Sequence, residues 1–133
     1  MPVRITILIK KLPTISTEEF HQYWSTSHPT TFLSVPIVQR NLSKYQQFHT
    51  DPAVSAALRA QGLPVSEFDG GAEFWANSYE EAMAVFQDPE YERVVVPDEM
   101  RFLDRQAARM MVGYEEVKWE DGKAAEGVKM GHA

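Results

Sequence analysis

The chain has 133 residues, no cysteine and a formal net charge of −6 at pH 7. This length allows one hydrophobic core, and the lack of cysteine excludes disulfides, a thiol nucleophile and a cysteine-bound zinc ion. The few basic residues are scattered, which argues against a nucleic acid or an anionic membrane as partner. No apolar run approaches the about 20 residues of a membrane span, and the start of the chain lacks the layout of a signal peptide, so a cytoplasmic protein is expected.

The first elements are expected to be a strand followed by a capped helix. Residues 3–10 alternate between β-branched and mainly polar side chains, which is the period of a half-buried strand. Ser16 opens a capping box, so a helix should begin there. We expect this helix to end near His28, because Pro29 disfavours a helical residue before it. Residues 29–41 contain two prolines and are expected to form a loop with one short turn.

The middle of the chain predicts two more strands. Residues 42–50 alternate again, and Asp51 followed by proline starts a short helix over residues 52–61. A third strand is expected at 68–76, and the paired glycines near its start indicate a bulge or a close approach by another group.

The second half is expected to repeat the pattern of helix and strand. A second capping box at Ser78 begins a helix, and residues 91–104 continue in broken helical pieces. A fourth strand is expected at 108–119. Residues 1–119 therefore form one domain, and the polar residues 120–133 are expected to be a flexible tail.

The order βαββαβ is typical of the α+β ferredoxin-like sandwich. Two helices cover only one face of a four-stranded sheet, so the other face would expose Thr6 and Leu8. We expect a homodimer that packs sheet to sheet, as in a dimeric α+β barrel. Alternatively, this face has mixed polarity and remains exposed to solvent, since Arg4 and Lys10 lie on it as well.

The sequence has no cysteine, and no cluster of acidic residues and histidines has the spacing of a metal site. The histidines are therefore the candidates for general acid–base catalysis. His28 ends the first helix, where a cleft between sheet and helices is expected. Tyr23, Trp24 and Phe32 would form apolar walls of this cleft. The alternative is that His28 only stabilises the helix terminus through the dipole.

His49 is the second candidate, because it ends the second strand on the same face as Tyr45 and Gln47. If that face is the inner one, His49 reaches the same cleft as His28. Otherwise it is a strand-end histidine bonded to the next turn. Tyr45 is the tyrosine best placed as a proton donor or substrate clamp.

The remaining candidates carry weaker signals. Tyr91 and Phe102 lie on the broken second helix and are expected in the pocket wall or the core. His21 is expected to be a flanking residue of the first helix, and His132 a solvent-exposed residue of the tail.

Several motifs together resemble the EthD-like dimeric α+β barrel proteins, over residues 3–119. The motifs are Phe20-His21-x-Tyr23-Trp24-x-x-x-His28-Pro29, Tyr45-x-x-x-His49, Phe68-Asp69-Gly70-x-Ala72-Glu73, Asp88-Pro89-Glu90-Tyr91 and Asp98-Glu99-x-Arg101-Phe102-x-Asp104. Within this family the chain is most similar to small fungal members of aromatic polyketide pathways, of which the best known are decarboxylases of an atrochrysone-type carboxylic acid. The resemblance implies a small enzyme without a bound cofactor and a hydrophobic, ring-shaped substrate. It also implies that His28 is the family histidine and that Asp69 orients His28 or His49; otherwise Asp69 is an ordinary turn residue before a strand.

These expectations combine into a hypothesis of a cofactor-independent lyase that decarboxylates an aromatic polyketide carboxylic acid. One histidine would act as general acid or base, and Tyr45 or the other histidine would hold the substrate oxygen. The alternatives are a polyketide cyclase or dehydratase, a cofactor-free anthrone oxygenase, and a non-catalytic dimer that binds a small molecule.

Overall fold

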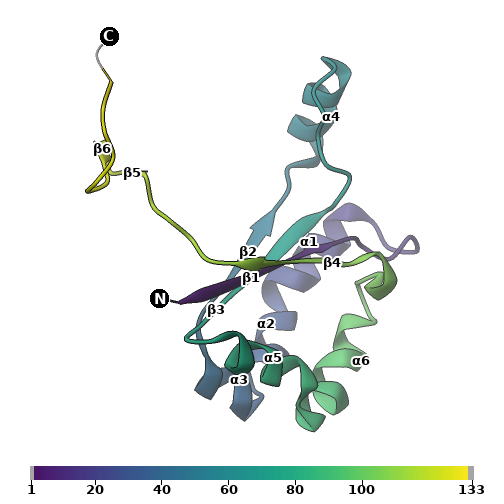
Figure 1. Cartoon of the computed structure of the whole chain (residues 1–133). Helices are drawn as coiled ribbons and strands as arrows, with labels where there is room; N and C mark the ends of the chain where they lie inside the picture. The colour runs from purple at the N-terminus through teal and green to yellow at the C-terminus, as the bar shows by residue number, and fades with distance from the viewer. Residues whose placement is uncertain (1, 132–133) are drawn as a thin grey trace.

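The computed structural model describes residues 2–131 and is built around one antiparallel sheet of four strands (Figure 1). The strands are β1 (Val3–Ile9), β2 (Leu42–His49), β3 (Gly70–Ala76) and β4 (Arg109–Gly113), in the order β2-β3-β1-β4. This order confirms the predicted ferredoxin-like α+β fold.

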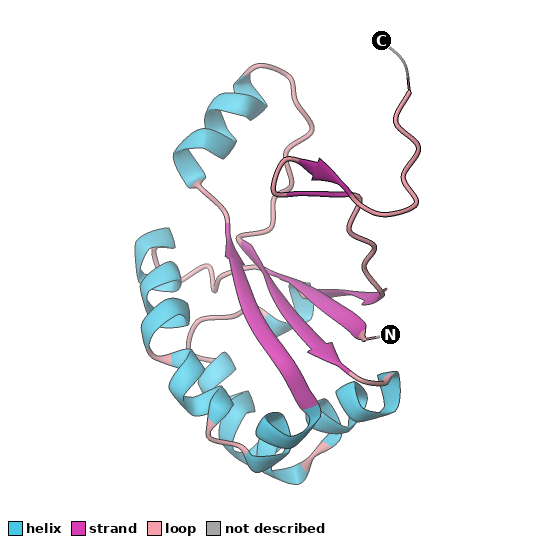
Figure 2. Ribbon diagram, turned by 90° about the vertical axis from the view of Figure 1, so that its left-hand side faces the viewer, coloured by secondary structure: helices cyan, strands magenta, loops and turns pink. Residues whose placement is uncertain are grey.

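The helices cover one face of the sheet, as Figure 2 shows. They are α1 (Thr17–Thr26), α2 (His28–Leu33), α3 (Pro36–Asn41), α5 (Tyr79–Gln87), a π-helical turn η1 (Tyr91–Val95), α6 (Val96–Glu99) and a 3₁₀ turn η2 (Arg105–Ala107). The predicted capping box is confirmed, because Ser16 accepts the N–H of Glu19 and Glu19 returns a bond to the N–H of Ser16. The predicted broken helical pieces over residues 91–104 are confirmed, because this segment contains the two separate elements η1 and α6.

The expected loop over residues 29–41 is wrong, because this segment belongs to α2 and α3. In each helix the proline lies in the first turn, where its missing N–H has no intrahelical partner to lose. His28 therefore begins α2 instead of ending α1.

The inner face of the sheet forms the core. Val3, Ile5 and Ile9 of β1 are buried in the same core cluster as Phe20 and Trp24 of α1. Because side chains alternate along a strand, Arg4, Thr6 and Leu8 of β1 lie on the outer face of the sheet, which no helix of the described residues covers.

The end of the chain does not form the expected long strand over residues 108–119. Strand β4 ends at Gly113, and the residues after it lead to a small hairpin of β5 (Trp119–Glu120) and β6 (Lys123–Ala124). Asp121 and Gly122 have φ values of 53° and 74°, the conformation of a two-residue Asp-Gly hairpin turn. His132, expected in solvent, lies outside the described residues.

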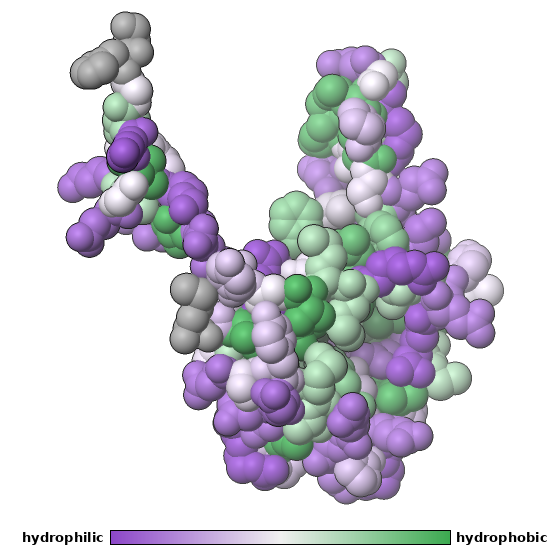
Figure 3. Space-filling model, in the orientation of Figure 1, coloured by the Kyte–Doolittle hydropathy of each residue, from purple (hydrophilic) through white to green (hydrophobic). Residues whose placement is uncertain are grey.

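The predicted helix over residues 52–61 is confirmed as α4 (Pro52–Ala60), which begins at an Asp51 cap. No residue of α4 is buried, and its apolar side chains, such as Val54, face solvent (Figure 3). Helix α4 and the β5–β6 hairpin are two separate projections that extend from the same end of the body (Figures 1 and 2). None of the helices in residues 2–131 is both long enough and apolar enough to cross a membrane.

Candidate functional site

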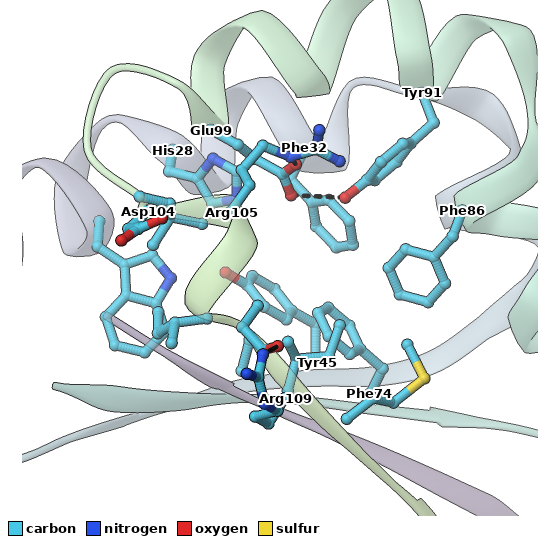
Figure 4. Close-up of a pocket in the computed structure, with 17 residues that line it drawn as sticks. His28, Phe32, Tyr45, Phe74, Phe86, Tyr91, Glu99, Asp104, Arg105 and Arg109 are labelled. Atoms are coloured by element: carbon cyan, nitrogen blue, oxygen red, sulfur yellow. Dashed lines mark hydrogen bonds and ion pairs between the residues drawn. The ribbon is translucent and has the colours of Figure 1, made fainter. Parts of the chain in front are cut away.

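A cavity of about 300 Å³ lies between the helices and the inner face of the sheet (Figure 4). Its walls are mainly aromatic and aliphatic. The lining residues are Ile7, Ile9, Trp24, His28, Phe32, Tyr45, Ala72, Phe74, Phe86, Tyr91, Glu99, Leu103, Asp104, Arg105, Ala108, Arg109 and Met110. The volume is in the range of small-molecule sites.

The expected wall residues separate into two groups. Trp24, Phe32 and Tyr91 line the cavity. Phe102 is fully buried in the core and contacts the ring of His28, while Tyr23 lies behind the cavity wall and donates its hydroxyl hydrogen to Asp98. Tyr23 and Phe102 therefore support the site without lining it.

His28 is the histidine of the cavity, and its side chain is only 7% exposed. Its Nδ1 lies 2.7 Å from Oδ2 of Asp98 in α6. A carboxylate at this distance accepts the Nδ1 hydrogen, so the neutral ring presents Nε2 as a proton acceptor. His28 and Asp98 thus form a base with a fixed tautomer beside the cavity.

The family resemblance implied that Asp69 orients His28 or His49. In the structure, the carboxylate bonded to His28 is that of Asp98. Asp69 precedes β3, where Oδ2 accepts the backbone N–H of Lys11 at 2.8 Å and its own N–H donates to Ile9. Within residues 2–131 no hydrogen bond joins Asp69 to His28 or His49. This agrees with the alternative interpretation of Asp69 as a structural residue before a strand.

His49 does not share the cavity with His28. Its ring lies against Trp24, with 4.3 Å between centroids and an interplanar angle of 38°, and Trp24 itself lines the cavity, so His49 lies behind this wall. His49 Nδ1 lies 2.7 Å from Nδ1 of His21. Burial lowers the pKa of both histidines. The neighbouring His21 lowers the pKa of His49 further, whereas the negative charge of Asp69 partly offsets the effect of burial on His21.

Tyr45 lies in the cavity wall. Its ring stacks on Phe74 with an interplanar angle of 8° and contacts Phe32. The hydroxyl oxygen accepts a hydrogen bond from Nε2 of Gln47 at 2.8 Å. Burial raises the pKa of Tyr45, so the hydroxyl stays protonated at neutral pH.

A second polar group at the cavity was not anticipated from the sequence. The hydroxyl of Tyr91 donates to Oε2 of Glu99 at 2.6 Å, and Oε1 of Glu99 accepts from Nε of Arg105 at 3.1 Å (Figure 4). Burial, and next the charge of Glu99, raise the pKa of Tyr91. Among residues 2–131, no three His, Asp or Glu side chains gather closely enough to hold a metal ion.

Comparison with solved structures shows the class of this fold. One similar structure is described as a dimeric protein with a ferredoxin-like fold from Bacteroides fragilis, with a TM-score of 0.57, 10% identity, and coverage of 86% of this chain and 96% of that one. An EthD family protein from Bacillus halodurans has a TM-score of 0.58 and 17% identity, over 87% of this chain and all of that one. The chain belongs to the EthD domain family, whose pattern matches residues 12–106. It is also 26% identical over 125 residues to Dehydratase aurZ of Gibberella zeae, across 91% of this chain and 82% of that protein.

Proposed function

We propose that this chain is a lyase that eliminates water from an aromatic polyketide bound in the cavity. The observation that carries the proposal is the bond between His28 Nδ1 and Asp98, which presents a fixed base to a cavity with aromatic walls. Stacked rings such as Phe74 and Tyr45 suit a flat, ring-shaped ligand. The similarity to a fungal protein named as a dehydratase supports the same reaction class.

The side chains supply the steps of a dehydration. Nε2 of His28 takes the proton from the carbon beside a ring carbonyl, and the electrons of that C–H bond move toward the carbonyl oxygen. Tyr45 donates a hydrogen bond to this oxygen and stabilises its negative charge. The enolate then expels the hydroxyl group from the next carbon, and the His28 imidazolium protonates it, so that water leaves and His28 is neutral again. Asp98 stabilises the imidazolium between the two steps.

Decarboxylation of a polyketide carboxylic acid is the second candidate, and the apolar walls of the cavity favour it. A carboxylate held among such side chains is poorly solvated, which favours its loss as carbon dioxide. The electrons of the C–C bond would move to the carbonyl oxygen held by Tyr45. His28 would take the carboxyl proton and return it to the carbon.

A mass-resolved assay separates these functions. The purified protein is incubated without added cofactor with an aromatic polyketide carboxylic acid that carries a β-hydroxy ketone. We expect loss of a mass of about 18 Da for water; loss of about 44 Da would instead identify the decarboxylase. Binding of the acid without turnover would favour the non-catalytic alternative and contradict the lyase.

Variants test whether His28 and Tyr45 carry the reaction. We expect His28→Ala to lower kcat about 100-fold to 10,000-fold and Asp98→Asn to lower it at least about tenfold, because the tautomer is then no longer fixed. Tyr45→Phe should cost about 100-fold. Tyr79→Phe is the matched control, because Tyr79 is an exposed tyrosine on α5.

We further infer that the functional unit is a homodimer packed through the outer face of the sheet. This face carries the exposed Phe48 and Met111 around the buried Glu73, which pairs with Arg4 and accepts from Gln46. The polar groups of Glu73, Arg4 and Gln46 thus bond to one another within one chain. The exposed apolar side chains of this face can then be buried against a second copy of the protein. The dimeric protein of similar fold from Bacteroides fragilis supports this inference.

A further inference from the structure

A chain of hydrogen bonds leads from α1 along β2 to the cavity wall. It begins at His21 of α1, whose Nδ1 lies 2.7 Å from Nδ1 of His49. His49 Nε2 lies 2.8 Å from Oε1 of Gln47, and Nε2 of Gln47 lies 2.8 Å from the hydroxyl oxygen of Tyr45. Three residues of β2 and one of α1 thereby end on the one hydroxyl that the proposed reaction uses.

A backbone carbonyl fixes the direction of this chain. Nε2 of Gln47 also donates to the carbonyl oxygen of Trp24 at 2.8 Å. A carbonyl oxygen can only accept, so the amide nitrogen must lie on this side and the amide oxygen must face His49. His49 therefore donates from Nε2, and its neutral ring accepts at Nδ1 the hydrogen of Nδ1 of His21.

The direction determines what Tyr45 can do. The two amide hydrogens of Gln47 are directed to Trp24 and Tyr45, so the hydroxyl oxygen of Tyr45 is an acceptor in this bond. Its own hydrogen then remains for a ligand in the cavity. Burial lowers the pKa of both histidines and so keeps their rings neutral near pH 7. The neutral rings preserve the direction of this series of hydrogen bonds.

We propose that Gln47 and His49, with His21 behind them, are positioning residues that hold Tyr45 as a hydrogen-bond donor to the substrate oxygen. The inference rests on the proposed function, because it acts through Tyr45. An amide side chain does not readily pass a proton, so the chain orients the hydroxyl and does not conduct protons through it.

The direction of the chain is measured without any substrate. Long-range ¹H–¹⁵N NMR spectra of the wild-type protein at pH 8 report which ring nitrogen of each histidine carries hydrogen. We expect His49 to be protonated at Nε2 and His21 at Nδ1. A His49 protonated at Nδ1 instead would overturn the proposal, whether or not the protein proves to be a lyase.

Enzyme kinetics then test the positioning role. In Gln47→Glu the carboxylate accepts the hydrogen of Tyr45, so kcat should fall about 100-fold, as in Tyr45→Phe, while KM changes by less than about threefold. The double variant Gln47→Glu/Tyr45→Phe should be no slower than Tyr45→Phe. His49→Gln, which keeps a donor, should retain more activity than His49→Leu, and Gln22→Glu on the exposed face of α1 is the control for the added charge.

Multiplied losses in the double variant would show that Gln47 acts independently of Tyr45 and would overturn the proposal. If the wild-type protein shows no turnover, the proposed function fails, and the tautomers measured by NMR still decide the direction of the chain.

Discussion

His21 and His49 share a hydrogen bond in an environment that disfavours their charged forms. Burial holds the pKa of both below the ordinary value of 6.5, so the folded protein binds protons less readily at these sites than the unfolded chain does. Their contribution to stability is complete above pH 6.5 and is lost as the pH falls below this value through the lower pKa of the folded state.

We predict that the double variant His21→Gln/His49→Gln loses less stability on acidification than the wild type. The free energy of unfolding, measured with urea at pH 7.5 and at pH 5.0, should fall less for the variant, because two of the groups that take up protons on unfolding are gone. An equal fall in the free energy of unfolding of the two proteins would contradict the lowered pKa of His21 and His49.

At the residue scale, the sequence predicted which side chains reach the cavity better than it predicted their hydrogen-bond partners. The cavity positions of His28, Tyr45 and part of the aromatic wall were predicted from chemistry and local pattern, whereas Tyr23, expected in the wall, and Phe102, expected in the wall or the core, lie behind it. The partner of His28 was not, because Asp98 lies 70 residues away in the chain and only the packing of α6 on α2 brings the two together. Asp69 had a turn signature, and its side chain accepts the backbone N–H of Lys11, which lies 58 residues away in the chain.

At the scale of the elements, the start of β3 depends on a close approach between a strand and a helix. A Cβ atom at Gly70 would lie 2.5 Å from the indole of Trp24 and 2.7 Å from the backbone oxygen of Phe48. This is the close approach that the paired glycines had indicated. At Gly71, the nearest contact of a Cβ would be an ordinary 3.6 Å to the Thr6 methyl group.

We predict that Gly70→Ala lowers the free energy of unfolding by about 1–3 kcal/mol, because Trp24 and the backbone of β2 must shift. Gly71→Ala is the matched control and should change it by less than about 0.5 kcal/mol. Urea unfolding of both variants measures the difference. Similar values for the two would show that the approach of Trp24 to Gly70 is not tight.

The elements that sequence reasoning missed carry local signals whose meaning depends on their position in the fold. Pro29 and Pro36 favour a loop when the sequence is considered alone, but each lies in a first helical turn, where proline is tolerated. The Asp-Gly pair at Asp121 belongs to a polar segment and was not recognised as a hairpin turn. Regular alternation and capping boxes, by contrast, predicted β1, β2 and the starts of α1 and α5 correctly.

For the whole molecule, the outer face of the sheet predicts a dimer. Sedimentation at micromolar concentration should give about twice the chain mass of 15.2 kDa. Met111→Glu, which places a charge on this face, should shift the protein toward the monomer. Met100→Glu is the matched control, because Met100 is 62% exposed and Met111 is 63% exposed, but Met100 lies at the end of α6. A wild-type mass near that of one chain would refute the dimer.

The π-helical turn over Tyr91–Val95 has a consequence for how related chains diverge. Its bond from the N–H of Val96 to the carbonyl of Tyr91 spans five residues, so the turn contains one residue more than an α-helix would need. Deletion of a single codon here would restore an α-helix and rotate Tyr91 by about 100° about the helix axis, away from Glu99. Gain or loss of one residue in this turn is thus a short evolutionary route to a cavity of different shape, while the sheet and the other helices remain unchanged.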